Sequence, residues 1–339
     1  MVTLADVARR AGVSASTVSY VLSGKRSISR GTRERVQRAI ADLNYHPHAG
    51  ARALASNRSN VLALMVPLRS DMYVPVIMEI VTAIVAEARE FDQDVLLLTG
   101  PEGGDGLRRV VRSGRADALI LMDVELEDRR IPVLREVATP AVLIGLPSDS
   151  TDLTCIDLDF AATGAACADH LADLGHRDVA LIGESQEVYR RHTGFAERTL
   201  AGFLGRAAER GLRSVHRPCE GTFESAAGTL TRIIGERPST TGFVVQNEAA
   251  IPPLMSLLRQ LGRLVPEESS VLAICPDQVA LQTSPQLTSV SIPAAEMGRG
   301  AVRLAMAQLE GRPTVGTTLL PPKLTIREST GGPPQPSYS

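Results

Sequence analysis

The chain has 339 residues, of which 44% are apolar and 22% are charged, and its formal net charge at pH 7 is −2. These proportions are typical of a globular protein with two or three domains and exclude a disordered or fibrous chain. Aromatic residues make up 3% of the chain and tryptophan is absent, so we do not expect a ligand pocket built on several stacked rings.

Charge is distributed unevenly along the chain. Residues 1–60 contain ten lysines or arginines and three acidic residues, a net +7, which leaves −9 on residues 61–339. A basic segment on an acidic body is typical of a DNA-binding module joined to a second domain. No apolar run approaches the ~20 residues that span a bilayer, and the first residues contain no apolar signal segment. We therefore expect a cytoplasmic protein without membrane contact.

The first part of the chain predicts three short helices. A helical spacing of apolar residues covers Leu4–Ala11, and Gly12 ends that helix. Ser14 is a favourable N-cap for a second helix. That helix should bury Val18, Val21 and Leu22, and a third, over residues 32–43, should bury Val36, Ala39, Ile40 and Leu43.

Two short helices joined by a turn that contains glycine form a helix-turn-helix, whose second helix enters the major groove of DNA. The alternative is a three-helix bundle without a nucleic-acid role, and the excess of basic residues argues against it. Pro47 ends this domain, because it lacks an N–H and disfavours helix at the preceding residue. We place the helix-turn-helix domain at residues 1–47 and a hinge or linker at 48–59.

Residues 60–330 change to strand-length apolar runs that alternate with helices. Strands are expected at 61–66, 94–99, 118–122, 141–145, 179–183, 242–246 and 270–274. Helices are expected at 75–91, 107–113, 132–137, 161–174, 195–210 and 249–261. This alternation predicts two doubly wound, parallel α/β lobes around a cleft. The segment 331–339, rich in glycine and proline, is expected to be a disordered tail.

Residues 3–57 resemble the DNA-binding head of the lactose-repressor (LacI/GalR) family of bacterial regulators in five stretches. These are T-L-A-D-V-A-R-R-A-G-V-S at 3–14, T-V-S at 17–19, T-R-E-R-V at 32–36, L-N-Y-H-P at 43–47 and A-R-A-L-A at 51–55. The body resembles the family's effector-binding core, which is shaped like periplasmic sugar-binding proteins. The matching stretches there are 174–183, 265–274, 287–290 and 324–330.

The resemblance implies a set of DNA contacts. Base-reading positions fall on Ala15, Ser16 and Tyr20. Leu54 corresponds to a hinge-helix residue that pairs with its dimer mate and wedges into the minor groove, and Arg52 in the same segment is a further DNA-binding candidate. Phosphate contacts are implied at Thr17, Ser19, Ser23, Ser29 and Thr32, and Thr3 and Ser14 are further DNA-binding candidates. The alternatives are that Thr17 and Ser19 are solvated helix residues, and that residues 48–57 form a plain linker.

The resemblance also implies that a small effector, of which a sugar is the favoured kind, binds in the cleft. The residues that correspond to the family's effector contacts are Asp71, Tyr73, Asp123, Phe160, Arg191, Arg198, Asn247, Glu248 and Asp277. Either arginine can fill the cationic role, since Thr199 stands at the family's usual arginine position. Gly145 replaces the usual acid after the 141–145 strand. Tyr73 can instead pack in the core, and Asp159 can simply cap the next helix.

The family architecture crosses between the lobes three times, near residues 145–159, 287–293 and 319–325, and we expect the last part of the chain in the first lobe. A homodimer is expected, because a two-fold protein reads a palindromic operator in double-stranded DNA. Effector binding should shift the dimer interface and disorder the hinge helices.

Other classes of function have less support. A transport-type binding protein is at odds with the basic head. An α/β enzyme with a fused head needs a catalytic constellation, and the sequence contains no HExxH, GxSxG or P-loop. The histidines and cysteines lack metal-ligand spacing, so neither a metal nor a cofactor is expected. We therefore expect a ligand-responsive transcriptional regulator, a repressor of carbohydrate genes, and not an enzyme.

Overall fold

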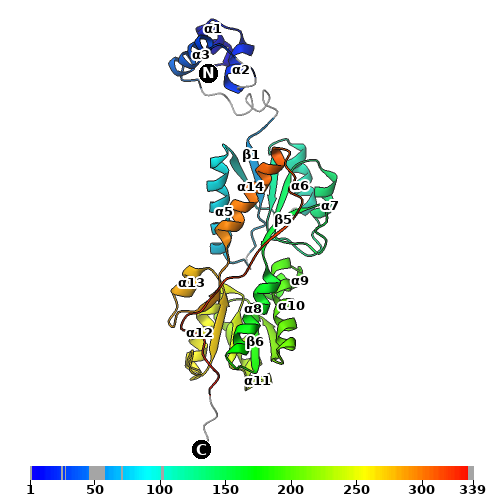
Figure 1. Ribbon diagram of the computed structural model, residues 1–339, viewed down its shortest axis with the longest axis vertical. Helices are drawn as coiled ribbons and strands as arrows, with labels where there is room; N and C mark the ends of the chain where they lie inside the picture. Colours follow the sequence, from blue (N-terminus) through cyan, green and yellow to red (C-terminus); the bar gives the residue numbers. More distant parts are fainter. Residues whose placement is uncertain are drawn as a thin grey trace, which may run out of the picture.

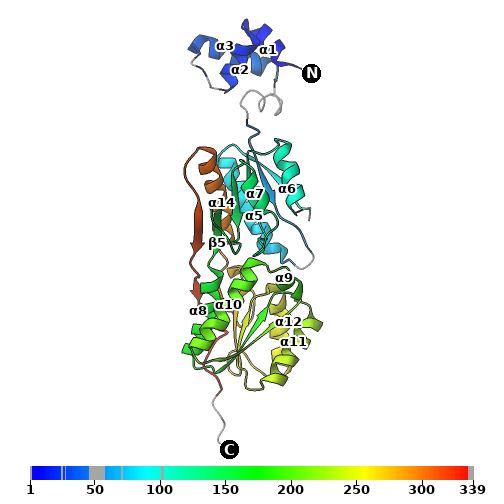
Figure 2. The same cartoon turned by 90° about the vertical axis from the view of Figure 1, so that its right-hand side faces the viewer.

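The computed structural model describes residues 2–23, 26, 28–45, 58–69, 72–100 and 103–334. A small helical head and two α/β lobes follow one another along the longest axis of the molecule (Figures 1 and 2). The predicted class, a helix-turn-helix head on a two-lobed α/β core, is confirmed. The expected hinge residues Arg52 and Leu54 lie outside the described residues.

The head consists of three helices, α1 (Leu4–Ala11), α2 (Ala15–Ser23) and α3 (Arg30–Asp42). Gly12 adopts a left-handed conformation (φ 64°) that ends α1, and the Ser14 hydroxyl accepts the Thr17 N–H at 3.2 Å, which confirms the N-cap. The expectation for Leu22 is wrong, since it is 39% exposed. The core of the head is completed instead by Tyr45, which is 5% exposed.

The first lobe is a six-stranded parallel sheet with helices on both faces. Its strands are β1 (Val61–Met65), β2 (Asp94–Leu98), β3 (Ala118–Leu121), β4 (Ala141–Ile144), β5 (Thr154–Leu158) and β11 (Gly316–Leu320), in the order β11-β5-β4-β3-β1-β2. Its helices are α5 (Val74–Glu90), α6 (Gly103–Arg112), α7 (Ile131–Glu136) and α14 (Ala294–Leu309). Helices α5 and α14 cover one face, and α6 and α7 cover the other. Burial on both faces explains why the central strands read as continuous apolar runs.

The second lobe repeats this plan. Its strands are β6 (Asp178–Gly183), β7 (Arg213–Pro218), β8 (Gly242–Val245), β9 (Ser270–Ile274), β10 (Thr288–Val290) and the antiparallel β12 (Leu324–Thr325), in the order β12-β10-β9-β8-β6-β7. Helices α8 (Phe160–Asp173) and α10 (Gly194–Glu209) cover one face. Helices α11 (Phe223–Glu236) and α12 (Ile251–Gln260) cover the other face. The remaining short elements of this lobe are α9 (Gln186–Arg190), the 3₁₀ turn η1 (Glu248–Ala250) and α13 (Asp277–Leu281).

The chain passes between the lobes after β5, after β10 and after β11, in the three regions expected. Asp159 stands at the first crossing, where its carboxylate caps α8 by accepting the Ala162 N–H at 2.9 Å. The expectation that the last part of the chain lies in the first lobe is wrong. The chain enters the core in the first lobe, so after three crossings it ends in the second lobe, where β12 pairs with β10.

The segment after β12 is held on the second lobe by a buried histidine. The His176 ring bonds to Thr241 Oγ1 at 2.7 Å, Ser270 Oγ at 2.9 Å and the Gly331 carbonyl at 3.0 Å. Burial is the main cause that lowers the pKa of His176, so the ring stays neutral in these contacts at neutral pH. Gly331 was expected in the disordered tail, but its N–H also bonds to Ser270 Oγ at 2.9 Å, so the packed chain extends at least to Gly331.

Candidate functional sites: the head surface and the interlobe cleft

The outward face of α2 carries the residues expected to read bases. Ala15 and Ser16 are exposed, and Tyr20 is 37% exposed with the Arg26 guanidinium 5.8 Å from the centre of its ring. Thr17 and Ser19 are half-buried. The major groove is wide enough to admit an α-helix, and small or hydroxyl-bearing side chains of this kind can contact base edges there.

Hydroxyl groups gather at the start of each helix of the head. Ser14 Oγ lies 2.8 Å from both Ser16 Oγ and Thr17 Oγ1 at the start of α2. Ser29 caps α3 and bonds to Thr32 Oγ1 at 2.9 Å, and Thr3 caps α1. Helix N-termini with free N–H groups suit phosphate oxygens. Ser23 ends α2, at the opposite end of that helix.

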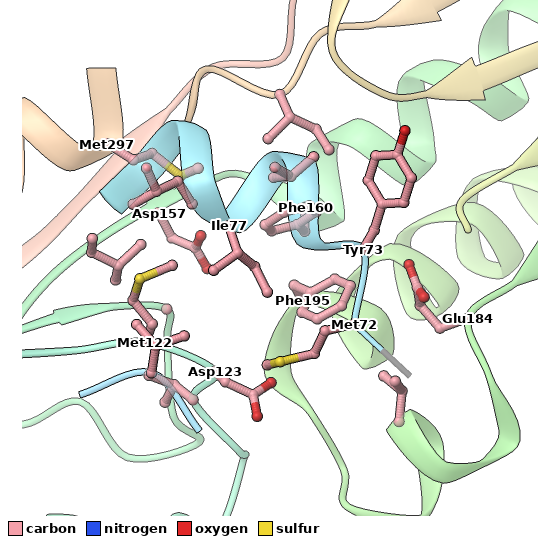
Figure 3. Close-up of a pocket in the computed structure, with 18 of the residues that line it drawn as sticks. Met72, Tyr73, Ile77, Met122, Asp123, Asp157, Phe160, Glu184, Phe195 and Met297 are labelled. Carbon is pink, nitrogen blue, oxygen red and sulfur yellow. The ribbon is translucent and has the colours of Figure 1, made fainter. Parts of the chain in front are cut away.

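A cavity lies between the lobes, where the carboxyl ends of their strands face each other (Figure 3). Its empty volume is about 1020 Å³, part of it open to solvent. Apolar side chains from both lobes dominate the lining, among them Val66, Ile77, Met122, Ile144, Phe160, Val188, Phe195, Ile274 and Met297. Polar groups are fewer, as is usual for a small-molecule site.

Five of the nine expected effector residues line this cavity: Tyr73, Asp123, Phe160, Arg191 and Glu248. Asp71 lies outside the described residues. The other three do not line the cavity, because their polar groups are used elsewhere. Arg198 donates to the carbonyls of Leu146 (3.3 Å) and Pro147 (2.9 Å). Asn247 bonds to the Cys219 carbonyl at 2.7 Å, and Asp277 pairs with Arg327 at 2.7 Å.

Asp123 is held in place by its neighbours. Its backbone is left-handed (φ 53°), a conformation uncommon outside glycine, asparagine and aspartate. Its carboxylate forms an ion pair with Arg69, and its carbonyl accepts a bond from Arg130 at 3.0 Å. Arg130 also makes a buried, two-pronged contact with Asp128, with distances of 2.6 and 2.9 Å. The Arg130–Asp128 pair thus fixes the loop that presents Asp123 to the cavity.

The pKa of Asp128 reflects two opposing effects. Burial raises it, but the hydrogen bonds and charge of Arg130 outweigh burial and lower the pKa of Asp128 below its ordinary value. Asp128 is therefore ionised at neutral pH and compensates the charge of Arg130.

The lining residues that the sequence did not predict include Asp157, Glu184, Phe195 and Gln246. Phe195 packs against Phe160 with ring centres 5.6 Å apart. Burial raises the pKa of Asp157 to about 8. Figure 3 shows Asp157 and Glu184 on opposite sides of the two phenylalanine rings. Glu184 directly follows the predicted strand 179–183, so the rule that ligands bind at the carboxyl ends of strands could have identified it.

Gly145 explains a departure from the family pattern. Its φ is +129°, and a Cβ atom there would lie 2.7 Å from the Val124 Cβ. A side chain at this point of the cleft would be strained and would collide with Val124. The acid that the family often has there is thus incompatible with this local backbone.

The lobes also touch directly at one edge of the cleft. The Leu126 N–H donates to the His192 carbonyl at 2.8 Å, and the Gly194 N–H donates to the Val124 carbonyl at 2.9 Å. These bonds join the loop after β3 to the turn before α10. Any change in the angle between the lobes must break or rearrange them.

Residues 58–60, where the expected hinge segment meets the first lobe, are attached to that lobe. Asp117 accepts bonds from the Ser59 N–H (2.7 Å), the Ser59 hydroxyl (2.9 Å) and the Asn60 N–H (2.8 Å). The Arg58 guanidinium donates to the Leu309 carbonyl at the end of α14, at 3.0 Å. These contacts fix residues 58–60 to the first lobe.

Neither a metal centre nor a membrane-spanning helix is found in the part of the chain that the structure describes. No cluster of three or more histidine, cysteine, aspartate or glutamate side chains there could hold a metal ion. None of the described helices has the length and apolar content needed to span a bilayer.

Comparison with known proteins finds one matching family model for the head and another for a large part of the core. Residues 3–48 match the model of bacterial regulatory proteins of the lacI family, and residues 168–330 match a periplasmic binding protein-like domain. The HTH-type transcriptional regulator CelR of Thermobifida fusca is 28% identical over 343 residues, covering 96% of this chain and 98% of that protein.

Solved structures agree over nearly the whole chain. The transcriptional regulator CelR–cellobiose complex has 26% identity and a TM-score of 0.70, covering 97% of this chain and 100% of that chain. The lac repressor dimer bound to operator and the anti-inducer ONPF has 24% identity and a TM-score of 0.83, covering 97% and 99%, which shows the shared fold. The chain thus combines a DNA-binding domain of the lacI family of bacterial regulatory proteins with a periplasmic binding protein-like domain, in the order found in regulators of that family.

Proposed function

We propose that the protein is a dimeric transcriptional repressor whose head binds a palindromic operator and whose cleft binds a small polar effector. The observation that carries this proposal is the combination of a basic helix-turn-helix head with a cavity lined by both lobes. Residues 1–47 are proposed as the DNA-binding domain, 48–59 as the hinge and 60–330 as the effector domain. The site of action is the chromosome, in the cytoplasm.

The proposed effector is a polyhydroxylated molecule such as a sugar, bound without being chemically changed. Phe160 and Phe195 offer an apolar surface for the C–H face of a sugar ring, and the cleft carboxylates accept hydrogen bonds from hydroxyl groups. The relative CelR, solved with cellobiose, supports this class of ligand. The target genes are proposed to serve carbohydrate uptake or catabolism.

The proposed regulation of operator binding depends on a ligand that contacts both lobes at once. Tyr73 and Asp123 come from the first lobe, and Glu184, Arg191 and Glu248 come from the second. A ligand shifts the angle between the lobes only as far as it binds one arrangement more tightly than the other. The Asp117 contacts with Ser59 and Asn60 would carry this shift to the hinge. The coupling can have either sign, so effector either releases the operator or strengthens its binding.

The DNA-binding part of the proposal is tested by incubating the full chain with sheared genomic DNA and sequencing the recovered fragments at several salt concentrations. We expect enrichment of a short palindrome beside sugar-utilisation genes. A steep dependence on salt without enrichment would show only non-specific phosphate binding. In that case Ala15, Ser16 and Tyr20 are not base-reading residues.

The proposed minor-groove wedge gives a sharper prediction. Leu54→Ala should weaken operator binding at least about tenfold, equal to about 1.4 kcal/mol, because a side chain inserted between base steps helps to hold the bent DNA. Effector affinity should stay the same. Leu261→Ala, the same change at a side chain that is 58% exposed in the second lobe, is the control and should bind operator normally. Fluorescence anisotropy with the selected operator measures both, and equal affinities of the two variants would disprove the wedge.

A further inference from the structure

The polar lining of the cleft is rich in carboxyl groups. Among the described lining residues there are four carboxylates, on Asp123, Asp157, Glu184 and Glu248, and one basic side chain, Arg191. Asp123 is compensated from outside the lining by its ion pair with Arg69. Asp157 is uncharged at neutral pH, because burial raises its pKa to about 8. The two acidic side chains that a ligand can contact together are therefore Glu184 and Glu248, both in the second lobe.

Glu184 and Glu248 form the acidic end of the cavity in the second lobe. They follow the neighbouring parallel strands β6 and β8, so they emerge at the same edge of the sheet. Each residue is 7% exposed. Tyr73 faces Glu248 from the first lobe and Cys275 faces it from the end of β9. No ion pair joins Glu248 to a basic residue in the described part of the chain.

A neighbouring amide group independently points to a ligand. Gln246 lines the cavity and is 3% exposed, and its Nε2 atom is buried with no hydrogen-bond partner. Its Oε1 atom accepts a long bond of 3.4 Å from the Tyr189 hydroxyl. A buried N–H group without an acceptor destabilises the fold, so such groups are rarely left unmatched. An oxygen atom of a ligand would satisfy it.

We propose that the effector is an amino sugar, whose protonated amino group binds between Glu184 and Glu248 and whose adjacent hydroxyl oxygen accepts a hydrogen bond from Gln246. This inference rests on the proposed function, in which the cleft is the effector site. An ammonium group offers three N–H donors and one positive charge, which suit two carboxylates. The apolar face of the sugar ring then packs on Phe160 and Phe195.

The acidic end makes binding depend on pH. Burial, and then the charge of Glu184, raise the pKa of Glu248 above its ordinary value, so the free cleft tends to hold a proton there. A bound ammonium favours the ionised carboxylate, so binding releases this proton. The affinity for an amino sugar should therefore rise with pH until the amine itself loses its charge. The affinity for the neutral parent sugar should not rise.

Isothermal titration calorimetry of the full chain tests the ligand class with three matched pairs. The probes are glucosamine, galactosamine and mannosamine, each against glucose, galactose or mannose, with the N-acetyl forms as uncharged controls. We expect at least one amino sugar to bind at least tenfold more tightly than its parent, and its N-acetyl form to lose that advantage. Binding of a neutral sugar without any advantage for its amino form would overturn the inference while leaving the proposed function intact. If nothing binds, the amino-sugar assignment is withdrawn and operator enrichment alone decides the proposed function.

The Glu248→Gln variant tests whether the Glu248 carboxylate binds the amino group of the ligand. It keeps the size of the side chain but removes its charge, so the advantage of the amino sugar over its parent should fall at least tenfold. The rise of affinity with pH should disappear. Glu224→Gln, at an exposed acid of the same lobe outside the cavity, should change neither. Thermal unfolding checks that each variant folds, and an unchanged amino-sugar preference in folded Glu248→Gln would contradict the assignment.

Discussion

Gly202→Ala is expected to destabilise the second lobe by about 3 kcal/mol or more, at the upper end of the range for overpacked sites. Helices α8 and α10 approach each other so closely that a Cβ atom on Gly202 would lie 2.0 Å from the Ala161 carbonyl oxygen. Gly164 faces the same contact from α8, where a Cβ atom would lie 2.2 Å from the Thr199 carbonyl oxygen. Both obstacles are helix backbone and cannot rotate away, so the helices would have to separate.

Gly205→Ala is the matched control, in the same helix three residues further along. A Cβ atom there has no neighbour within 4 Å. Alanine favours helix over glycine, so this variant should be more stable than the parent by about 0.5–1 kcal/mol. Urea unfolding followed by circular dichroism compares the two. Equal effects of the two substitutions would contradict the close helix contact described here.

Arg130→Met should lower the free energy of unfolding by about 3–5 kcal/mol, because removing one partner leaves the other charge buried and unpaired. The side chains of Arg130 and Asp128 are 8% and 5% exposed. The variant also loses the bonds from Arg130 to the Met122 and Asp123 carbonyls, each 3.0 Å. The loop that presents Asp123 should loosen, so effector affinity should fall together with stability.

The double variant Arg130→Met with Asp128→Asn separates charge from packing. It should recover part of the lost stability, because no unpaired charge remains. The folded pKa of Asp128 is lowered, so the stability from its charge is present above the unfolded pKa, about 3.9, and is lost as pH falls through the folded value. Urea unfolding between pH 3 and pH 7 measures both effects. A double variant less stable than Arg130→Met would refute the charge explanation.

The sequence predicted the central strands because parallel sheets are buried on both faces and leave uninterrupted apolar runs. It missed the elements that lack this signal. Strand β7 lies at a sheet edge, is only partly buried and contains Arg213, His216 and Arg217. Helix α14 contains Gly298 and Gly300, which lower helix propensity. Gly298 is explained by the fold, since a Cβ atom there would lie 2.8 Å from the Ile80 carbonyl oxygen of α5.

Sequence reasoning reached the lining of the cavity where a residue follows a strand that was itself predicted, as for Asp123 and Glu248. Transferring a single position from the family pattern did not identify a lining residue where the side chain makes local contacts instead. Arg198 is the example, because its guanidinium donates to the Leu146 and Pro147 carbonyls. Asp157 lies inside a strand that was not predicted, so its burial in the cleft could not be foreseen. Which side chains face the cavity depends on how the two lobes meet, and this information is spread over the whole chain.

The central claim is that occupancy of the cleft controls operator binding. The most direct test is a fluorescence-anisotropy titration of the selected operator with the full-length protein, at fixed salt, with and without the sugars and amino sugars that calorimetry finds to bind. We predict that at least one of them changes the operator Kd at least about fivefold, a typical coupling of about 1 kcal/mol. The same compound should have no such effect when its binding is weakened by Glu248→Gln. A compound that saturates the cleft and leaves the operator Kd unchanged would contradict the account.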